Sequence, residues 1–135
     1  MSNLESIVPP LELCKQIPAG EFEDSVLVWT AHGVRSVEEL SRLEFCKNLP
    51  IRKLTFPAPT LAEILAKIPA AINGVGVLEL ALDDRAENND GRYVICYNRY
   101  GVDGALEETT QLESDNNPAT AALRVWLRIR REDGR

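Results

Sequence analysis

The sequence contains little of the chemistry that most enzymes and metal sites need, with one histidine and three cysteines in 135 residues. A structural zinc site requires paired ligands at short spacing, and no C-x-x-C pair occurs. Cys14, Cys46 and Cys96 are odd in number, lie far apart and sit in apolar segments. They therefore predict reduced thiols that pack as small hydrophobic side chains, not a disulfide framework. We predict no bound metal.

Common catalytic and cofactor-binding motifs are also missing. The chain has no Gly-rich phosphate loop, no G-x-S-x-G and no H-E-x-x-H, which excludes the commoner motif-bearing enzyme classes. The sequence thus predicts no cofactor. A small enzyme remains an alternative, in which Cys96 or Cys46 would act as a nucleophile with His32 as its base.

No apolar run is long enough to cross a bilayer. The longest, Val75–Leu82, is interrupted by Gly76 and Glu79 and falls short of the roughly 20 residues that a membrane span needs. Met1–Pro10 has no basic cluster ahead of an apolar stretch, as a secretory signal would have. These features predict a cytoplasmic protein without membrane contact.

Charge is acidic and unevenly distributed, with a net charge of −6. Residues 124–135 hold five arginines and two acidic residues, whereas the rest of the chain holds ten basic and nineteen acidic residues. Binding to nucleic acid depends on clustered Lys and Arg that displace counterions. A broad nucleic-acid interface is therefore disfavoured, and the C-terminal end is the remaining candidate for one.

Local patterns predict several helices. Pro9 and Pro10 precede a short helix over 11–17, and Ser36–Glu39 and Thr60–Glu63 both match capping boxes. The first box predicts a helix over about 37–47, with a strand near 43–46 as the alternative. The second opens a helix that ends before Pro69, with an apolar face at Leu61, Ile64, Leu65 and Ile68.

The last predicted helix runs from Pro118 to about Arg131, with Asn117 as its N-cap. One face is apolar, and arginines line the opposite face. The apolar face carries Ala119, Ala122, Leu123, Trp126 and Ile129, flanked by Val125 and Leu127. The arginines are Arg124, Arg128, Arg131 and Arg135.

Strands are predicted where residues alternate or are rich in β-branched and aromatic side chains. The predicted strands cover 25–30, 51–56, 76–83, 92–100 and an edge strand near 109–113. Pro57 and Pro59 should prevent the second strand from continuing. The segments 76–83 and 92–100 predict an antiparallel hairpin, whose connecting loop is rich in turn residues and acids. That loop lacks the ligand spacing of an EF-hand, so we interpret it as solvated.

The whole chain, 1–135, therefore predicts a single α+β domain. We expect a small antiparallel sheet of three to five strands with two main helices, beginning at Thr60 and Pro118, packed on one face.

Three ordered segments resemble a family of small uncharacterised proteins from bacterial genomes and their prophages. The segments are Pro57–Leu65, Tyr93–Tyr97 and Asn117–Leu127. Leu11–Cys14 and Val28–Trp29 are similar to the same family's opening helix and strand. The resemblance implies an α+β fold and an origin in a mobile element, and it carries no activity or site residues.

The sequence offers two sets of candidate binding residues. Arg124, Arg128 and Arg131 suit an anion or RNA, although arginines near a helix C-terminus also stabilise the helix dipole. Tyr100, beside Gly101 at a strand end, is the aromatic residue that we expect to be partly exposed.

We predict a non-catalytic accessory protein that binds another protein through its acidic surface or a sheet edge. The alternatives are the Cys/His enzyme and an anion or nucleic-acid binder that uses the arginine helix. The sequence leaves open whether the protein is a monomer or a dimer.

Overall fold

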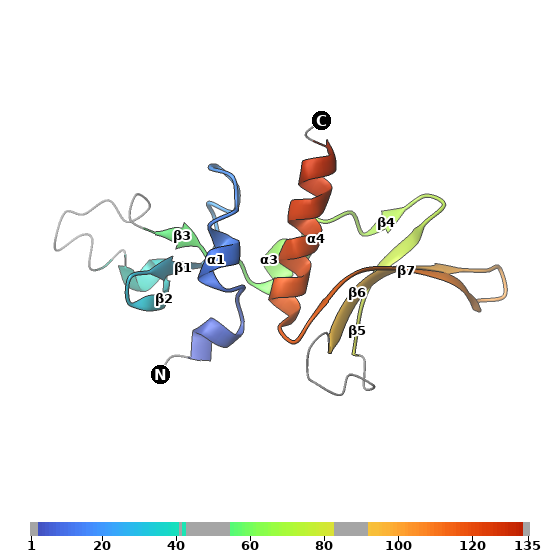
Figure 1. The fold of residues 1–135 in the computed structure, drawn as a ribbon, viewed down its shortest axis with the longest axis horizontal. Coiled ribbons are helices and arrows are strands. Elements are labelled where there is room, and N and C mark those ends of the chain that lie inside the picture. Colours follow the sequence, from blue (N-terminus) through green and yellow to red (C-terminus); the bar gives the residue numbers. More distant parts are fainter. Residues whose placement is uncertain (1–2, 41, 43–54, 83–91, 134–135) are drawn as a thin grey trace.

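The computed structural model describes residues 3–40, 42, 55–82 and 92–133, which form two antiparallel sheets with helices between them (Figure 1). The helices are a 3-10 helix at Asn3–Ser6, α1 Leu11–Cys14, α3 Leu61–Leu65 and α4 Pro118–Asp133. Residues 37–40 and 42 are helical as well. The strands are β1 Leu27–Thr30, β2 Gly33–Ser36, β3 Phe56–Pro57, β4 Ala71–Ile72, β5 Gly76–Leu82, β6 Tyr93–Tyr100 and β7 Leu106–Asp115. The α+β fold class is confirmed.

A three-stranded sheet of order β2-β1-β3 makes up one end of the molecule. The prediction for β1 is confirmed, but β2 was not predicted: it pairs with β1 through a tight turn that places Gly33 at φ 100°. Pro57 belongs to β3, contrary to our expectation that it would stop the strand. Because β3 is an edge strand, its proline removes no donor that another strand would need.

The capping box that opens α3 is confirmed in full. The Thr60 hydroxyl accepts a hydrogen bond from the Glu63 backbone N–H at 3.4 Å, and the Glu63 carboxylate accepts one from the Thr60 N–H at 2.8 Å. Helix α3 is shorter than predicted, since regular helix ends at Leu65 and turns continue toward Pro69. Ile64 and Ile68 are buried, as the predicted apolar face required.

A four-stranded sheet of order β4-β5-β6-β7 makes up the other end. The predicted hairpin is confirmed, with Leu78 opposite Tyr97 and Leu80 opposite Ile95. Strand β7 is longer than the predicted edge strand and, as expected, lies at the edge of the sheet among the described strands. Because side chains alternate along a strand, Ile95 and Tyr97 share one face of this sheet. Cys96, Asn98 and Tyr100 lie on the other.

Helix α4 packs against the Ile95 face of this sheet, close to β6 and β7. Asn117 caps it as predicted, because its side-chain oxygen accepts a hydrogen bond from the Ala119 N–H at 2.9 Å. The apolar face is buried from Ala119 to Leu127. Helix α4 thus packs against both the sheet and α3, and the three form one core.

Phe22 and Trp126 link the N-terminal segment to this core. Their rings meet edge to face with centroids 4.8 Å apart. Phe22 adopts φ 57°, a left-handed conformation that is uncommon for a bulky residue, and only 2% of it is exposed. Its burial against Trp126 offsets the local backbone strain.

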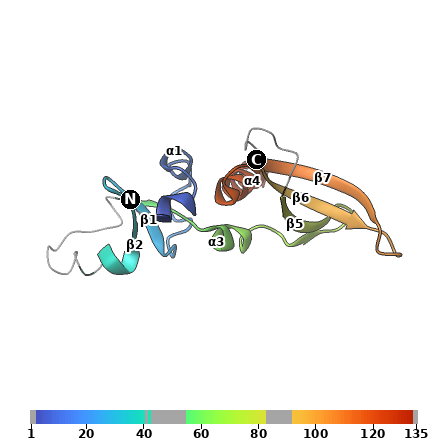
Figure 2. The same cartoon turned by 90° about the horizontal axis from the view of Figure 1, so that it is seen from below.

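The molecule is elongated, with the three-stranded sheet, the helices and the four-stranded sheet in a row (Figures 1 and 2). Trp29 packs against two clusters of buried residues, one that includes Trp126 and one that includes Val8 and Val34. Among the described residues, no helix is long and apolar enough to span a membrane. The predictions for residues 43–54, for the loop at 83–91, and for Cys46 and Arg135 lie outside the described residues.

Candidate functional site

The four-stranded sheet extends beyond the helices, and its far end consists of residues 72–77 and 98–108. We call this part the projecting end. Figure 2 shows that the far parts of β6 and β7 carry no helix on either side. Helix α4 crosses the sheet only near the opposite ends of these strands. The projecting end is therefore a surface that the described helices leave open.

Apolar side chains gather on the four-stranded sheet and its turns. Seven of the ten large hydrophobic residues that are exposed among the described residues belong to it. They are Ile72, Val77, Leu80, Leu82, Tyr100, Val102 and Leu106. Such a concentration is unusual, because exposed apolar residues on a protein that acts alone are normally scattered singly.

Three of these residues share one face of the projecting end. Tyr100 and Leu106 are direct partners across β6 and β7, and Val77 lies opposite Asn98, two residues from Tyr100 on the same side. They are 45%, 54% and 42% exposed, respectively. We call Val77, Tyr100 and Leu106 the outer patch. The partial exposure predicted for Tyr100 is confirmed.

Polar groups surround the outer patch and fix its shape. The Tyr100 hydroxyl donates a hydrogen bond to Glu79, and this bond raises the pKa of the Tyr100 phenol. The Thr109 hydroxyl donates to the Asn98 side-chain oxygen at 2.7 Å. An apolar centre with a polar rim is the usual anatomy of a protein interface.

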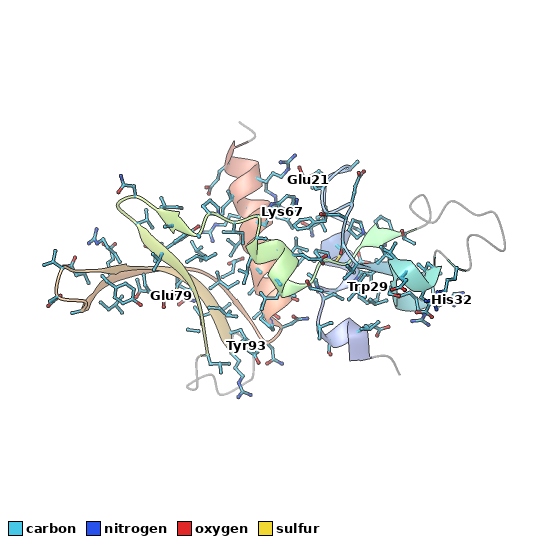
Figure 3. All side chains as sticks on the ribbon, turned by 180° about the vertical axis from the view of Figure 1, so that it is seen from behind. Glu21, Trp29, His32, Lys67, Glu79 and Tyr93 are labelled. Carbon is cyan, nitrogen blue, oxygen red and sulfur yellow. The ribbon has the colours of Figure 1, made fainter. Side chains whose placement is uncertain are left out.

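Cys96 lies beneath this rim and is only 3% exposed. Burial raises the pKa of its thiol, and the nearby Glu79 carboxylate raises it further. Glu79 and Cys96 are direct partners on the neighbouring strands β5 and β6. Figure 3 shows His32 far from Glu79, at the other end of the molecule. The structure therefore does not bring Cys96 and His32 together, and the thiol stays protonated at neutral pH.

Cys14 is equally unsuited to nucleophilic chemistry. Burial raises the pKa of its thiol from 9.0 to about 12, and only 1% of the residue is exposed. The thiol donates weakly to the Pro9 carbonyl at 3.5 Å. It packs in the core, as a small hydrophobic side chain does.

These thiol environments predict slow alkylation of the native protein. At pH 8 the thiolate fraction of Cys14 should be on the order of a thousandfold lower than in the unfolded chain, as its raised pKa requires. The rate at which iodoacetamide labels each cysteine, followed by peptide mapping in native buffer and in urea, measures this difference in reactivity. Fast native labelling of Cys14 or Cys96 would contradict the buried, protonated state.

The same pKa shift predicts a loss of stability at high pH. The pKa of Cys14 is higher in the folded than in the unfolded chain, so the unfolded chain releases the proton first as pH rises. The contribution of Cys14 to stability is complete below about pH 9 and falls between pH 9 and about 12. In urea titrations across this range, the Cys14→Ala protein should lose less stability than the wild type.

The predicted arginines come together in a separate groove. Arg124, Arg128 and Arg131 line a hollow of about 270 Å³ beside Leu13, Gln16 and Glu113. We call this hollow the arginine groove. It runs along α4, with residues from α1 and its following turn on one side and β7 on the other. Tyr100 is not part of it.

Each arginine in the groove has an acceptor within the chain. Arg124 donates to Asp115 at 3.1 Å, Arg128 donates to the Leu112 carbonyl at 2.8 Å, and Arg131 donates to Gln16 at 3.0 Å. Glu113 lies 3.8 Å from Arg128, beyond hydrogen-bond distance. Two of the three guanidinium groups are therefore hydrogen-bonded to neutral oxygens.

A larger cleft adjoins the arginine groove at Arg124, which lines both. Its volume is about 650 Å³, and its walls include Trp29, Tyr93, Asn117 and Thr120. This volume lies within the range of small-molecule sites. In the described part of the chain, no group of three or more His, Cys, Asp or Glu residues is placed to hold a metal ion.

Sequence reasoning found the arginines and Tyr100 but missed Val77 and Leu106. Val77 falls in the predicted strand 76–83, but nothing in the sequence indicates that its side of the strand is open, and Leu106 lies outside the predicted strands. Comparison with known proteins adds no further residue: the chain matches no family model, no curated protein and no solved structure.

Proposed function

We propose that this protein is a non-catalytic module that binds another protein through the outer patch. The observation that supports this most directly is the concentration of exposed Val77, Tyr100 and Leu106 on a sheet face that α4 does not cover. Tyrosine and other large side chains with a polar rim are typical anchors of protein interfaces.

Charge at the projecting end favours a basic partner. Residues 98–108 hold one arginine, Arg99, and three acidic residues, Asp103, Glu107 and Glu108. Arg99 pairs with Glu108 at 2.8 Å and approaches Glu107 at 3.8 Å, so it cannot balance all three acids. Complementary charge speeds encounter and selects partners. The proposed partner therefore presents an apolar centre flanked by Lys or Arg.

The open edge of β7 lies next to this surface. None of the described strands pairs with the ten-residue β7 on the side away from β6. An exposed edge can accept an additional strand, and acidic side chains on it discourage pairing with a second copy of the same acidic edge. The edge thus supports binding to a different, basic protein.

Replacing two residues of the outer patch should strongly weaken binding of the partner. We expect the Tyr100→Ser and Leu106→Ser double variant to bind the partner at least about 30-fold more weakly, since buried interface anchors each contribute more than about 1 kcal/mol. The partner is captured from host lysate with tagged wild-type protein, and its affinity is then measured by biolayer interferometry at two salt concentrations.

A matched control distinguishes the outer patch from general surface hydrophobicity. Val26 is 59% exposed and lies outside the four-stranded sheet, so Val26→Ser should bind as the wild type does. Weaker binding at higher salt is expected for a basic partner. Capture of no protein, or equal capture by the double variant, would contradict the proposal.

An origin in a mobile element and a cytoplasmic location remain part of this proposal. The mobile-element origin rests on the resemblance of the segments around Pro57, Tyr93 and Asn117. The cytoplasmic location rests on apolar runs that are too short to span a membrane and on cysteines that we predict to be reduced.

A further inference from the structure

The arginine groove lies apart from the outer patch and has a different chemistry. Arg124, Arg128 and Arg131 are spaced at i, i+4 and i+7 on α4, so they follow one another along about 10 Å of the helix axis. Leu13 and Leu127 also line the groove. It therefore offers several guanidinium groups together with apolar side chains.

The hydrogen bonds of these arginines hold them in position without using all their donors. A guanidinium group has five N–H donors, and each arginine here donates a hydrogen bond to one acceptor among the described residues. Further donors can reach a ligand in the groove, and at Arg128 the ligand competes with the Glu113 carboxylate, which lies 3.8 Å away. Because the side chains are already ordered, a ligand would bind with little loss of side-chain entropy.

Local charge in the groove is positive although the protein is acidic. Arg124 is hydrogen-bonded to a carboxylate, whereas the hydrogen-bond acceptors of Arg128 and Arg131 are a backbone carbonyl and an amide. At physiological salt, charges on the surface are screened beyond about 8 Å. Three guanidinium groups against the carboxylates of Asp115 and Glu113, the latter 3.8 Å from Arg128, leave a net charge of +1 among these side chains, which favours a small anion.

We infer that the arginine groove binds the phosphoryl group of a small phosphate ester. The planar fork of arginine matches the oxygens of a phosphoryl group and can bind two of them at once. The adjoining cleft of about 650 Å³, which Arg124 also lines, leaves room for the organic part of the ester.

The surrounding charge favours a small ligand over a nucleic acid. Outside residues 124–135 the chain carries ten basic and nineteen acidic residues, which repel an extended polyanion. Nucleic-acid affinity at physiological salt requires many phosphate contacts, and this groove offers three arginines. A single phosphoryl group in the groove meets one acidic lining side chain, Glu113, whereas an extended polyanion would also meet the acidic remainder of the surface.

The test is titration of the full-length protein with adenosine monophosphate, inorganic phosphate and a ten-nucleotide single-stranded RNA. Binding is followed by calorimetry and by the melting temperature. We expect adenosine monophosphate, at about ten times its dissociation constant, to raise the melting temperature by about 4 °C. Arg128→Lys keeps the positive charge but loses the planar fork, so it should weaken this binding at least about tenfold.

Arg130→Lys is the matched control. Arg130 lies on the same helix with similar exposure, but it pairs with Glu21 at 2.9 Å and stacks on Trp126, away from the groove. It should bind adenosine monophosphate as the wild type does, and circular dichroism verifies that both variants fold. Equal affinity in Arg128→Lys, no binding of either small probe, or binding of the RNA alone would overturn the inference.

Discussion

Replacing Trp126 by alanine should lower the free energy of unfolding by about 3–5 kcal/mol, the range for truncating a large buried aromatic residue. Trp126 is 6% exposed in the core between α3, α4 and the four-stranded sheet. Its ring contacts Phe22 edge to face, and the Arg130 guanidinium lies 5.6 Å from its centroid. The truncation also removes the contact that holds Phe22 in its left-handed conformation.

Urea denaturation followed by circular dichroism measures this effect. Phe56→Ala is the control, because Phe56 is also aromatic but 42% exposed at the edge of the three-stranded sheet. Its loss should cost less than about 1 kcal/mol, as for most surface positions. Equal losses in the two variants would mean that Trp126 is not at the centre of the core.

Replacing Glu63 by alanine should lower the free energy of unfolding by about 2–4 kcal/mol, because several hydrogen bonds to one carboxylate are lost together. This carboxylate accepts hydrogen bonds from the Thr60 N–H at 2.8 Å, the Ser25 hydroxyl at 3.1 Å and the Val26 N–H at 3.2 Å. It thereby joins α3 to the chain that enters β1. Ser25 is 2% exposed, and without Glu63 its hydroxyl would be left with the Leu27 carbonyl, at 3.1 Å, as its acceptor.

Glu39 provides the matched control, since it occupies the corresponding position in the other capping box. There the Ser36 hydroxyl accepts from the Glu39 N–H at 3.1 Å, and the Glu39 side chain is exposed. Glu39→Ala should cost less than about 1 kcal/mol. Thermal and urea unfolding of both variants test the difference, and a loss at Glu39 as large as at Glu63 would contradict the joining role of Glu63.

These two glutamates show how far local sequence determines this structure. Both capping boxes were recognisable, because a cap depends on residues three positions apart. The start of α4 at Asn117 and Pro118 and the strand β5 were also predicted from patterns within a few residues. What distinguishes Glu63 from Glu39 is contact with Ser25 and Val26, nearly forty residues away, which no local pattern encodes.

The candidate sites divide in the same way. The spacing of Arg124, Arg128 and Arg131 predicted their common helix face, because helical geometry is periodic. Their enclosure by Gln16 and β7 was not predictable, since it depends on how distant segments pack. Likewise, Tyr100 was recognisable by its position at a strand end, but the sequence gives no sign that Val77 and Leu106 are exposed beside it.

The sequence by itself determined the class of fold, the central hairpin, the N-terminal ends of the helices and the absence of common catalytic motifs. These features follow from interactions within a few residues and from composition. Only the tertiary structure decided the pairing of the proline-containing β3 with β1 and the length over which α4 covers the four-stranded sheet. Those features depend on pairing and burial between remote segments, and they left the outer patch exposed and enclosed the arginine groove.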